Sequence, residues 1–223
     1  MSTPATTPIN EAAALVGDPA FTRITQPTWT VFLNTAARDL ARKMRLIRRA
    51  ATFDLVANDP EYALPSDCIQ IIGMQYNLTP SDQTTWMKAK EMFEDEHQVA
   101  TNGSYSAGNP TRYLPRPDTF MFYPMPDTTI AAGGKITYWG MPDEVTNISS
   151  QSIPVMDFLR DSLRDRMVTF ALRRLEKWDA ASMAEKEWEA ALTVDRDRFE
   201  DRSADRRTAL RPRSSWTRFS GQT

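Results

Sequence analysis

The chain has very little of what catalytic and metal-binding sites are usually made from. Its 223 residues include one cysteine, Cys68, and one histidine, His97. A single cysteine excludes a disulfide within the chain and fits a reducing compartment. A Cys–His pair or a Ser–His–Asp triad would have to use His97, and no second histidine or cysteine completes a metal shell around the acidic stretch Glu94–His97. We therefore expect no metal, no cofactor and no catalysis, with Cys68 a small buried apolar group and Glu94–His97 a solvated face. The alternative, a hydrolase or metal enzyme, would lose its activity when His97 and Cys68 are replaced by alanine.

Long apolar runs and an excess of charge of one sign are also missing. No run approaches the roughly 18 apolar residues that a membrane-spanning helix needs, and the start, MSTPATTPIN, has no basic region or apolar core typical of a secretory signal. With 27 basic and 29 acidic side chains, the net charge of −2 favours neither nucleic acid nor a membrane as partner. Ile136 follows Gly134–Lys135 where a phosphate-binding loop has Ser or Thr. We expect a soluble, intracellular, globular protein.

Apolar residues recur every three or four positions in two parts of the chain, which predicts helices on both sides of a central segment. A stripe from Trp29 to Ile47 predicts a helix over 26–49, preceded by a short helix at about 8–16. After Pro154 the same period predicts one helix over 154–178 and another over about 180–207. The later stripes consist of Val155 or Met156, Leu159, Leu163, Met167, Phe170, Leu175 and Trp178, and then of Met183, Trp188, Leu192 and Phe199.

The central segment has the composition and the period of strands. It holds most of the 15 prolines, and stretches such as DCIQIIGMQYNL, TFMFYP and KITYWG alternate or run apolar over strand lengths. The sequence therefore predicts an α+β fold. In it, residues 1–58 and 150–207 form an antiparallel helical bundle, residues 59–149 form a small inserted antiparallel β-domain, and residues 208–223 form an extended C-terminal arm.

Charged side chains gather on two of the predicted helices. Basic residues follow one side of the first long helix, and acids alternate with arginines near the end of the last one. We expect these faces to pair between neighbouring copies of the chain. The alternative is a nucleic-acid-binding protein, whose affinity would fall by roughly 0.9 log units per phosphate contact per decade of salt. The residues concerned are Arg38, Arg42, Arg45, Arg49, Asp195, Asp197 and Asp201.

The C-terminal stretch LRPRSSWTRFSGQT follows neither a helical nor a strand period. Basic and aromatic side chains alternate in it, and Pro212 prevents the preceding helix from continuing. Such a composition is typical of a segment that orders against another surface. The alternative is a frayed terminus without a function. The residues expected to dock are Arg211, Arg213, Trp216, Arg218 and Phe219.

The order of these features resembles the head-to-tail adaptor, or connector, proteins of tailed bacteriophages. PTWTVFLNTAARDLARKMR resembles their opening helix, YALPSDCIQIIGM their strand entry, TFMFYPMPD their Phe–Tyr–Pro–x–Pro turn and KITYWGMPDEV the strand that follows. SIPVMDFLRDSLRDRMVTFALRRLEKW together with EKEWEAAL resembles their closing helix pair. The likeness covers about residues 25–195, and the order and spacing of the phrases carry it.

The resemblance implies a structural virion protein without enzymatic activity. Such adaptors form a ring, usually of twelve copies, beneath the portal, where they extend the DNA channel and present a platform for the tail. The implied partners are further copies of the chain, the portal protein, the next tail component (a nozzle, stopper or tail terminator) and passing genomic DNA bound without sequence specificity. The implied location is the head–tail interface of the virion, after synthesis in the host cytoplasm, with no membrane and no cofactor. In similar proteins a C-terminal segment reaches onto the portal or a neighbouring subunit.

Overall fold

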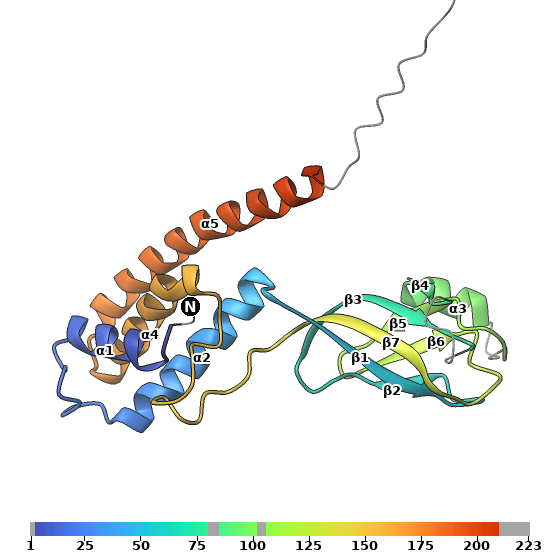
Figure 1. The fold of residues 1–223 in the computed structure, drawn as a ribbon, viewed down its shortest axis with the longest axis horizontal. Coiled ribbons are helices and arrows are strands. Elements are labelled where there is room, and N and C mark those ends of the chain that lie inside the picture. Colours follow the sequence, from blue (N-terminus) through green and yellow to red (C-terminus); the bar gives the residue numbers. More distant parts are fainter. Residues whose placement is uncertain (1–2, 80–84, 102–105, 210–223) are drawn as a thin grey trace, which may run out of the picture. The chain divides into compact units, whose positions relative to one another are not determined.

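The computed structural model describes residues 3–79, 85–101 and 106–209, without the side chains of residues 99, 101 and 197–209 (Figure 1). The chain is divided into two compact units, Met1–Leu33 with Thr146–Thr223, and Asn34–Val145. The described residues form five α-helices and one seven-stranded sheet. The α+β class predicted from the sequence is therefore confirmed.

The first unit is helical. Its elements are α1 (Thr6–Leu15), the beginning of α2 (Gln26–Met44), a short 3₁₀ turn (Asp157–Leu159), α4 (Arg160–Arg174) and α5 (Trp178–Ala209). Helix α4 packs against both α1 and α5. The apolar stripe of each helix is buried at this packing, which stabilises helices that would be marginal alone. The buried side chains include Ile9, Ala12, Leu163, Met167, Ala171, Ala181, Trp188 and Leu192.

Two residues of the predicted apolar stripes, Trp178 and Met183, are exposed instead, and of the two alternatives at the first stripe position Met156 is exposed while Val155 is half-buried. Met156, Trp178 and Met183 expose 43%, 62% and 64% of their surface. Met156 precedes the 3₁₀ turn, and Trp178 is the first residue of α5, so neither has a full helical turn around it. Met183 lies two positions from the buried Ala181, and a separation of two positions places it on the other side of the helix.

The first long helix is shorter than its apolar period predicts. Helix α2 ends at Met44, and strand β1 begins at Ile47, so the prediction of a helix to residue 49 is wrong. The N–H of Arg45 still donates to the carbonyl oxygen of Ala41 at 2.9 Å, but the φ of Arg45 is 51°, which turns the chain out of the helix. Because Ile47 follows Met44 by three positions, it fits both the helical stripe and the new strand.

The second unit is built on a mixed sheet. In spatial order its strands run β1-β7-β3-β4-β5-β6-β2. The neighbours β4 and β5 are parallel, and the other pairs are antiparallel, so the prediction of a purely antiparallel domain is wrong. The parallel pair arises because helix α3 (Glu94–Thr101) lies in the connection between β4 and β5. The strands are β1 (Ile47–Leu55), β2 (Glu61–Ala63), β3 (Cys68–Tyr76), β4 (Met87–Glu91), β5 (Arg112–Pro115), β6 (Thr119–Tyr123) and β7 (Ile130–Gly140).

Aromatic side chains curl this sheet around its core. Phe53 of β1, the first strand in the order, packs against Tyr62 of β2, the last one, with ring centroids 5.3 Å apart. Phe120 and Phe122 of β6 complete the cluster, with centroids 5.2 and 6.1 Å from that of Phe53. A Cβ atom at Gly134 would lie 2.2 Å from the ring of Phe53, so the ring requires glycine at this position. The two outer strands thus meet through side chains.

Candidate functional site

The described residues contain no cluster of three His, Cys, Asp or Glu side chains that could hold a metal ion. His97 exposes only 5% of its surface and packs edge to face with Tyr123, so the prediction that this histidine is solvated is wrong. The acids before it in α3 are exposed. Cys68 is half-buried beside the apolar core of the sheet, and burial raises the pKa of its thiol. Among the described helices, none combines the length and apolar character needed to cross a bilayer.

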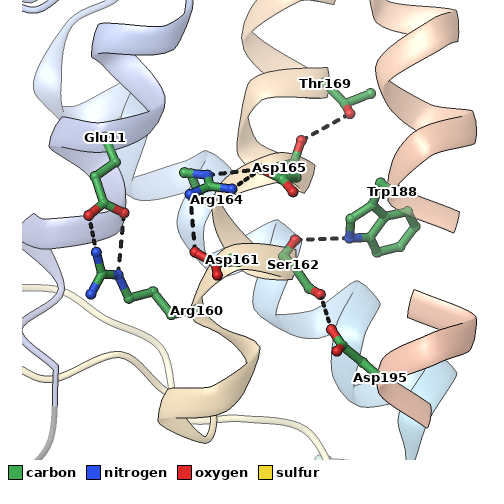
Figure 2. Close-up of polar contacts among 9 residues, drawn as sticks. All are labelled: Glu11, Arg160, Asp161, Ser162, Arg164, Asp165, Thr169, Trp188 and Asp195. Carbon is green, nitrogen blue, oxygen red and sulfur yellow. Dashed lines mark hydrogen bonds and ion pairs between the residues drawn. The ribbon is translucent and has the colours of Figure 1, made fainter. Parts of the chain in front are cut away.

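Helix α5 is fastened to α4 by a buried polar contact (Figure 2). The indole Nε1 of Trp188 donates to the carbonyl oxygen of Ser162 at 2.9 Å, and the hydroxyl of Ser162 donates to the carboxylate of Asp195 at 2.6 Å. Trp188 and Ser162 are both buried. Asp195, which the sequence suggested for a face between copies, therefore has a partner within its own unit.

Ion pairs connect α4 to α1 and brace α4 itself (Figure 2). The guanidinium of Arg160 donates to both carboxylate oxygens of Glu11 in α1, through its Nε at 3.3 Å and through a second nitrogen. The guanidinium of Arg164 donates to Asp161 at 3.1 Å and to Asp165 at 2.8 Å. These contacts use arginines and acids of the helical unit within a single copy.

A third group of charges lies where α4 and α5 meet. Glu185 of α5 accepts hydrogen bonds from Arg166 at 2.9 Å and from Arg173, both on α4. The hydrogen bond from Arg166 and the positive charge of both arginines hold the pKa of Glu185 below its ordinary value, against the opposing effect of burial. The guanidinium of Arg166 also lies over the rings of Phe170 and Trp188, at 4.7 and 4.4 Å from their centroids.

The four arginines expected on one helix face are divided among a helix, the turn that follows it and a strand. Arg38 and Arg42 lie on α2, Arg45 lies at the turn after it, and Arg49 lies in β1. Arg38 pairs with Glu144 at 3.6 Å, and both side chains are largely exposed. Arg49 pairs with two carboxylates, at 2.7 Å with Asp143 and 3.2 Å with Asp67, and the hydrogen bond with Asp143 raises the pKa of Arg49. The side chains of Asp197 and Asp201, and the arm residues Arg211, Arg213, Trp216, Arg218 and Phe219, lie outside the described part of the chain.

One face of the sheet carries cations that sequence reasoning did not bring together. Lys135 of β7 and Lys88 of β4 both lie opposite Gln75, the residue between them on β3. Because neighbouring residues across a sheet project to the same side, the two lysines share a face. Lys90 shares this face with Lys88, two positions along β4, and lies opposite Arg112 of β5. Arg48 of β1 also lies on this side, because it is four positions from Thr52, the residue opposite Lys135. We call the surface formed by Arg48, Lys88, Lys90, Arg112 and Lys135 the basic sheet face.

These cations come from four strands, so spacing along the chain does not reveal them. Strand alternation puts each on a predictable side of its own strand, but the strand order decides which of them become neighbours. Within the described residues, none of the five forms an ion pair, while the ammonium of Lys135 lies 5.6 Å from the ring centroid of Trp86.

A cavity of about 410 Å³ opens beside the basic sheet face. Arg48 and Lys88 supply cations to its lining, and Glu91 supplies one carboxylate. The hydroxyl of Tyr113 donates to that carboxylate at 3.4 Å, and burial together with the charge of Glu91 raises the pKa of Tyr113 to about 12. The remaining lining is apolar or neutral: Ile72, Gly73, Met74, Gln75, Ala89, Tyr113 and Thr137.

Comparison with known families decides the identity of the chain. The family model of the SU10 adaptor protein matches residues 4–215, which is nearly the whole length and spans both units. The chain belongs to the SU10 adaptor protein family. The resemblance to phage head-to-tail adaptors is thereby confirmed, and the chain is a phage adaptor, a class of structural proteins. No curated protein matches the sequence of this adaptor.

Proposed function

We propose that this adaptor forms a ring of twelve copies beneath the portal of a tailed phage, extends the DNA channel and presents a platform for the tail. The observation that carries the proposal is the family match over residues 4–215. Its partners are then the portal protein, the next tail component (a nozzle, stopper or tail terminator) and genomic DNA, which passes without being read for sequence. Its place is the head–tail interface of the virion.

The structure of the helical unit supports a role as the body of such a ring. Helix α4 packs against α1 on one side and α5 on another, and buried polar contacts reinforce the apolar packing. A bundle fastened in this way can bear contacts on its outer surfaces without rearranging. In this proposal the bundle packs around the ring, and the sheet unit faces the tail.

The arm, residues 208–223, is proposed as the docking element for the portal. Its three arginines would pair with acidic groups of the portal, where a guanidinium can form paired hydrogen bonds with a carboxylate. Trp216 and Phe219 would be buried as anchors, because aromatic side chains dominate the binding energy of many protein interfaces.

A pull-down with purified cognate portal rings tests this function. Three forms of the chain are compared: the full chain, a version that ends after Arg207, and a control that ends after Phe219 and lacks only the last four residues. We expect the full chain and the control to be retained and the version ending at Arg207 to be lost. Retention of all three would keep the adaptor and assign the arm to a neighbouring copy or to the tail. If none is retained, the adaptor function is wrong.

A further inference from the structure

We propose that the turn Phe93–Glu96 of one copy docks into the cavity beside the basic sheet face of the next copy. The proposal rests on the proposed function in that it names a contact between ring neighbours. Both surfaces belong to the same unit, Asn34–Val145, and consist of different residues, although Glu91 of the lining precedes Phe93 by only two positions. A contact between two different surfaces of identical chains is heterologous, and repeated heterologous contacts form a ring when the rotation between neighbours closes.

The turn offers an aromatic side chain that is unusually exposed. Phe93 exposes 72% of its surface, and a phenylalanine at the surface of a monomer leaves a large apolar area in water. The next three residues, Glu94, Asp95 and Glu96, are exposed acids in the first turn of α3. The turn is therefore an apolar knob bordered by three negative charges.

The backbone holds this turn in place before any partner arrives. The carboxylate of Glu96 accepts a hydrogen bond from the N–H of Phe93 at 3.3 Å, as in a helix-capping arrangement. Helix α3 is fixed in turn by the buried His97 and by the hydroxyl of Tyr123, which donates to the carbonyl oxygen of Ala100 at 2.7 Å. A rigid turn loses less conformational entropy on binding than a flexible loop does.

The cavity has the properties that such a turn needs. Its volume of about 410 Å³ admits an aromatic ring, and Ile72, which exposes 40% of its surface, is the apolar side chain that the lining offers to a partner, since Met74 and Ala89 are buried in the core of the sheet. Arg48 and Lys88 lie in the lining, where acids beside an inserted phenylalanine would meet them, and these two cations outnumber the one carboxylate of the lining, Glu91. A phosphate backbone would use the cations but leave the exposed side chain of Ile72 without a partner, so a segment with both an aromatic ring and carboxylates fits better.

Photo-crosslinking of the full-length chain tests the contact. Phe93 is replaced by p-benzoylphenylalanine, and equal amounts of ¹⁴N- and ¹⁵N-labelled protein are irradiated, alone and on cognate portal rings. We expect mixed-isotope products that join position 93 to peptides containing residues 72–75 or 88–91, the two stretches that hold most of the cavity lining. The control places the same photoreactive residue at Trp178, which is similarly exposed but belongs to α5. Products from position 93 that are absent, confined to one copy or as scattered as those from position 178 would overturn the proposal.

Charge reversal adds a second requirement. Lys88→Glu should lower the yield of the position-93 products about tenfold, because like charges then face each other. Lys186→Glu, at an exposed lysine of α5, should leave the yield unchanged. Adding Glu94→Lys to Lys88→Glu should restore most of the yield. A yield that is insensitive to Lys88→Glu contradicts the proposal.

Two further outcomes separate this contact from other roles. If Lys88→Glu abolishes retention on duplex DNA while the position-93 products persist unchanged, the basic sheet face binds DNA and the proposed contact is wrong. If the chain fails to bind portal rings while the position-93 products form and respond to charge reversal, the contact between copies stands. In that case the adaptor function alone is wrong.

Discussion

Glu185 ties two helices together through a single carboxylate. It receives guanidinium groups from Arg166 and Arg173, and Arg166 in turn stacks on Trp188. The apolar period of the sequence identifies Trp188 as a core residue, but it does not identify these polar partners. Which residues of two helices face each other depends on where the first helix ends and how the second packs against it. Tertiary packing decides this, and the apolar period of the sequence does not show it.

The neutral variant Glu185→Gln should lower the free energy of unfolding by about 1 kcal/mol at pH 7, since two partly exposed ion pairs are lost. The pKa of Glu185 in the folded state lies below its ordinary value of 4.5. The ionised carboxylate therefore stabilises the fold above about pH 4.5, and this stabilisation is lost as the pH falls through the lowered pKa.

Urea denaturation of both proteins between pH 3 and pH 7 measures this effect. The difference between wild type and variant should shrink as the solution becomes more acidic. Glu187→Gln, at an exposed position of the same helix, is the matched control and should change stability little at any pH. A difference for Glu185→Gln that does not vary with pH would contradict the ion-pair explanation.

At the scale of elements, the end of α4 shows a helix terminus that side chains alone do not predict. The N–H of Glu176 donates to the carbonyl oxygen of Arg173 at 3.1 Å, and that of Lys177 donates to Leu172 at 3.0 Å. This pair of bonds is the Schellman motif. Its left-handed position is Glu176, with φ of 60°, where most helices have glycine or asparagine.

Replacing Glu176 by glycine should therefore stabilise the hairpin of α4 and α5. Removing the strain of a left-handed non-glycine residue gains roughly 1–2 kcal/mol, and the greater freedom of glycine in the unfolded chain costs about 0.5–1 kcal/mol. We expect a net gain of about 0.5–1 kcal/mol, measured as a higher urea midpoint. Lys177→Gly, one position later, is the control and should not stabilise. A lower midpoint for Glu176→Gly would show that the glutamate side chain contributes more than the strain costs.

Helices whose apolar stripe extends over several turns could be predicted from the sequence. Features that depend on which strands lie side by side could not. Helices α2, α4 and α5 were found because their buried stripes extend over several turns. The end of α2 was predicted too late because Ile47 fits the helical spacing of the apolar stripe although it begins strand β1, and because arginine is a good helix former. The basic sheet face was missed because its cations become neighbours only through the order of β1, β7, β3 and β4.

At the scale of the whole molecule, one asparagine marks where the chain enters and leaves the sheet unit. The side-chain amide of Asn34 donates to the carbonyl oxygen of Val145 at 2.9 Å, and its oxygen accepts from the N–H of Val145 at 2.9 Å. Both residues are buried. The first and last residues of the unit are thus joined to each other by two hydrogen bonds.

Asn34→Leu keeps the size of the side chain and removes both bonds, which leaves two buried backbone groups of Val145 without these partners. We expect the free energy of unfolding to fall by about 2–4 kcal/mol. Arg38→Ala is the control one turn later; it removes only the exposed pair with Glu144 and should cost less than about 1 kcal/mol. Thermal unfolding followed by calorimetry measures both. Equal losses for the two variants would contradict the role of Asn34 as a clamp.

Because the sheet unit begins at Asn34 and ends at Val145, the two units of the chain can complete their folding at different times during synthesis. Helix α1 packs on α4, yet every residue of Asn34–Val145 is made between them. At about 5–20 residues per second, that interval lasts on the order of ten seconds. The sheet unit has its complete sequence as soon as Val145 leaves the ribosome, whereas α1 lacks α4, the helix on which it packs, until α4 has been made. During translation the sheet unit can therefore fold first, and the packing of α1 on α4 can form only after α4 has been made.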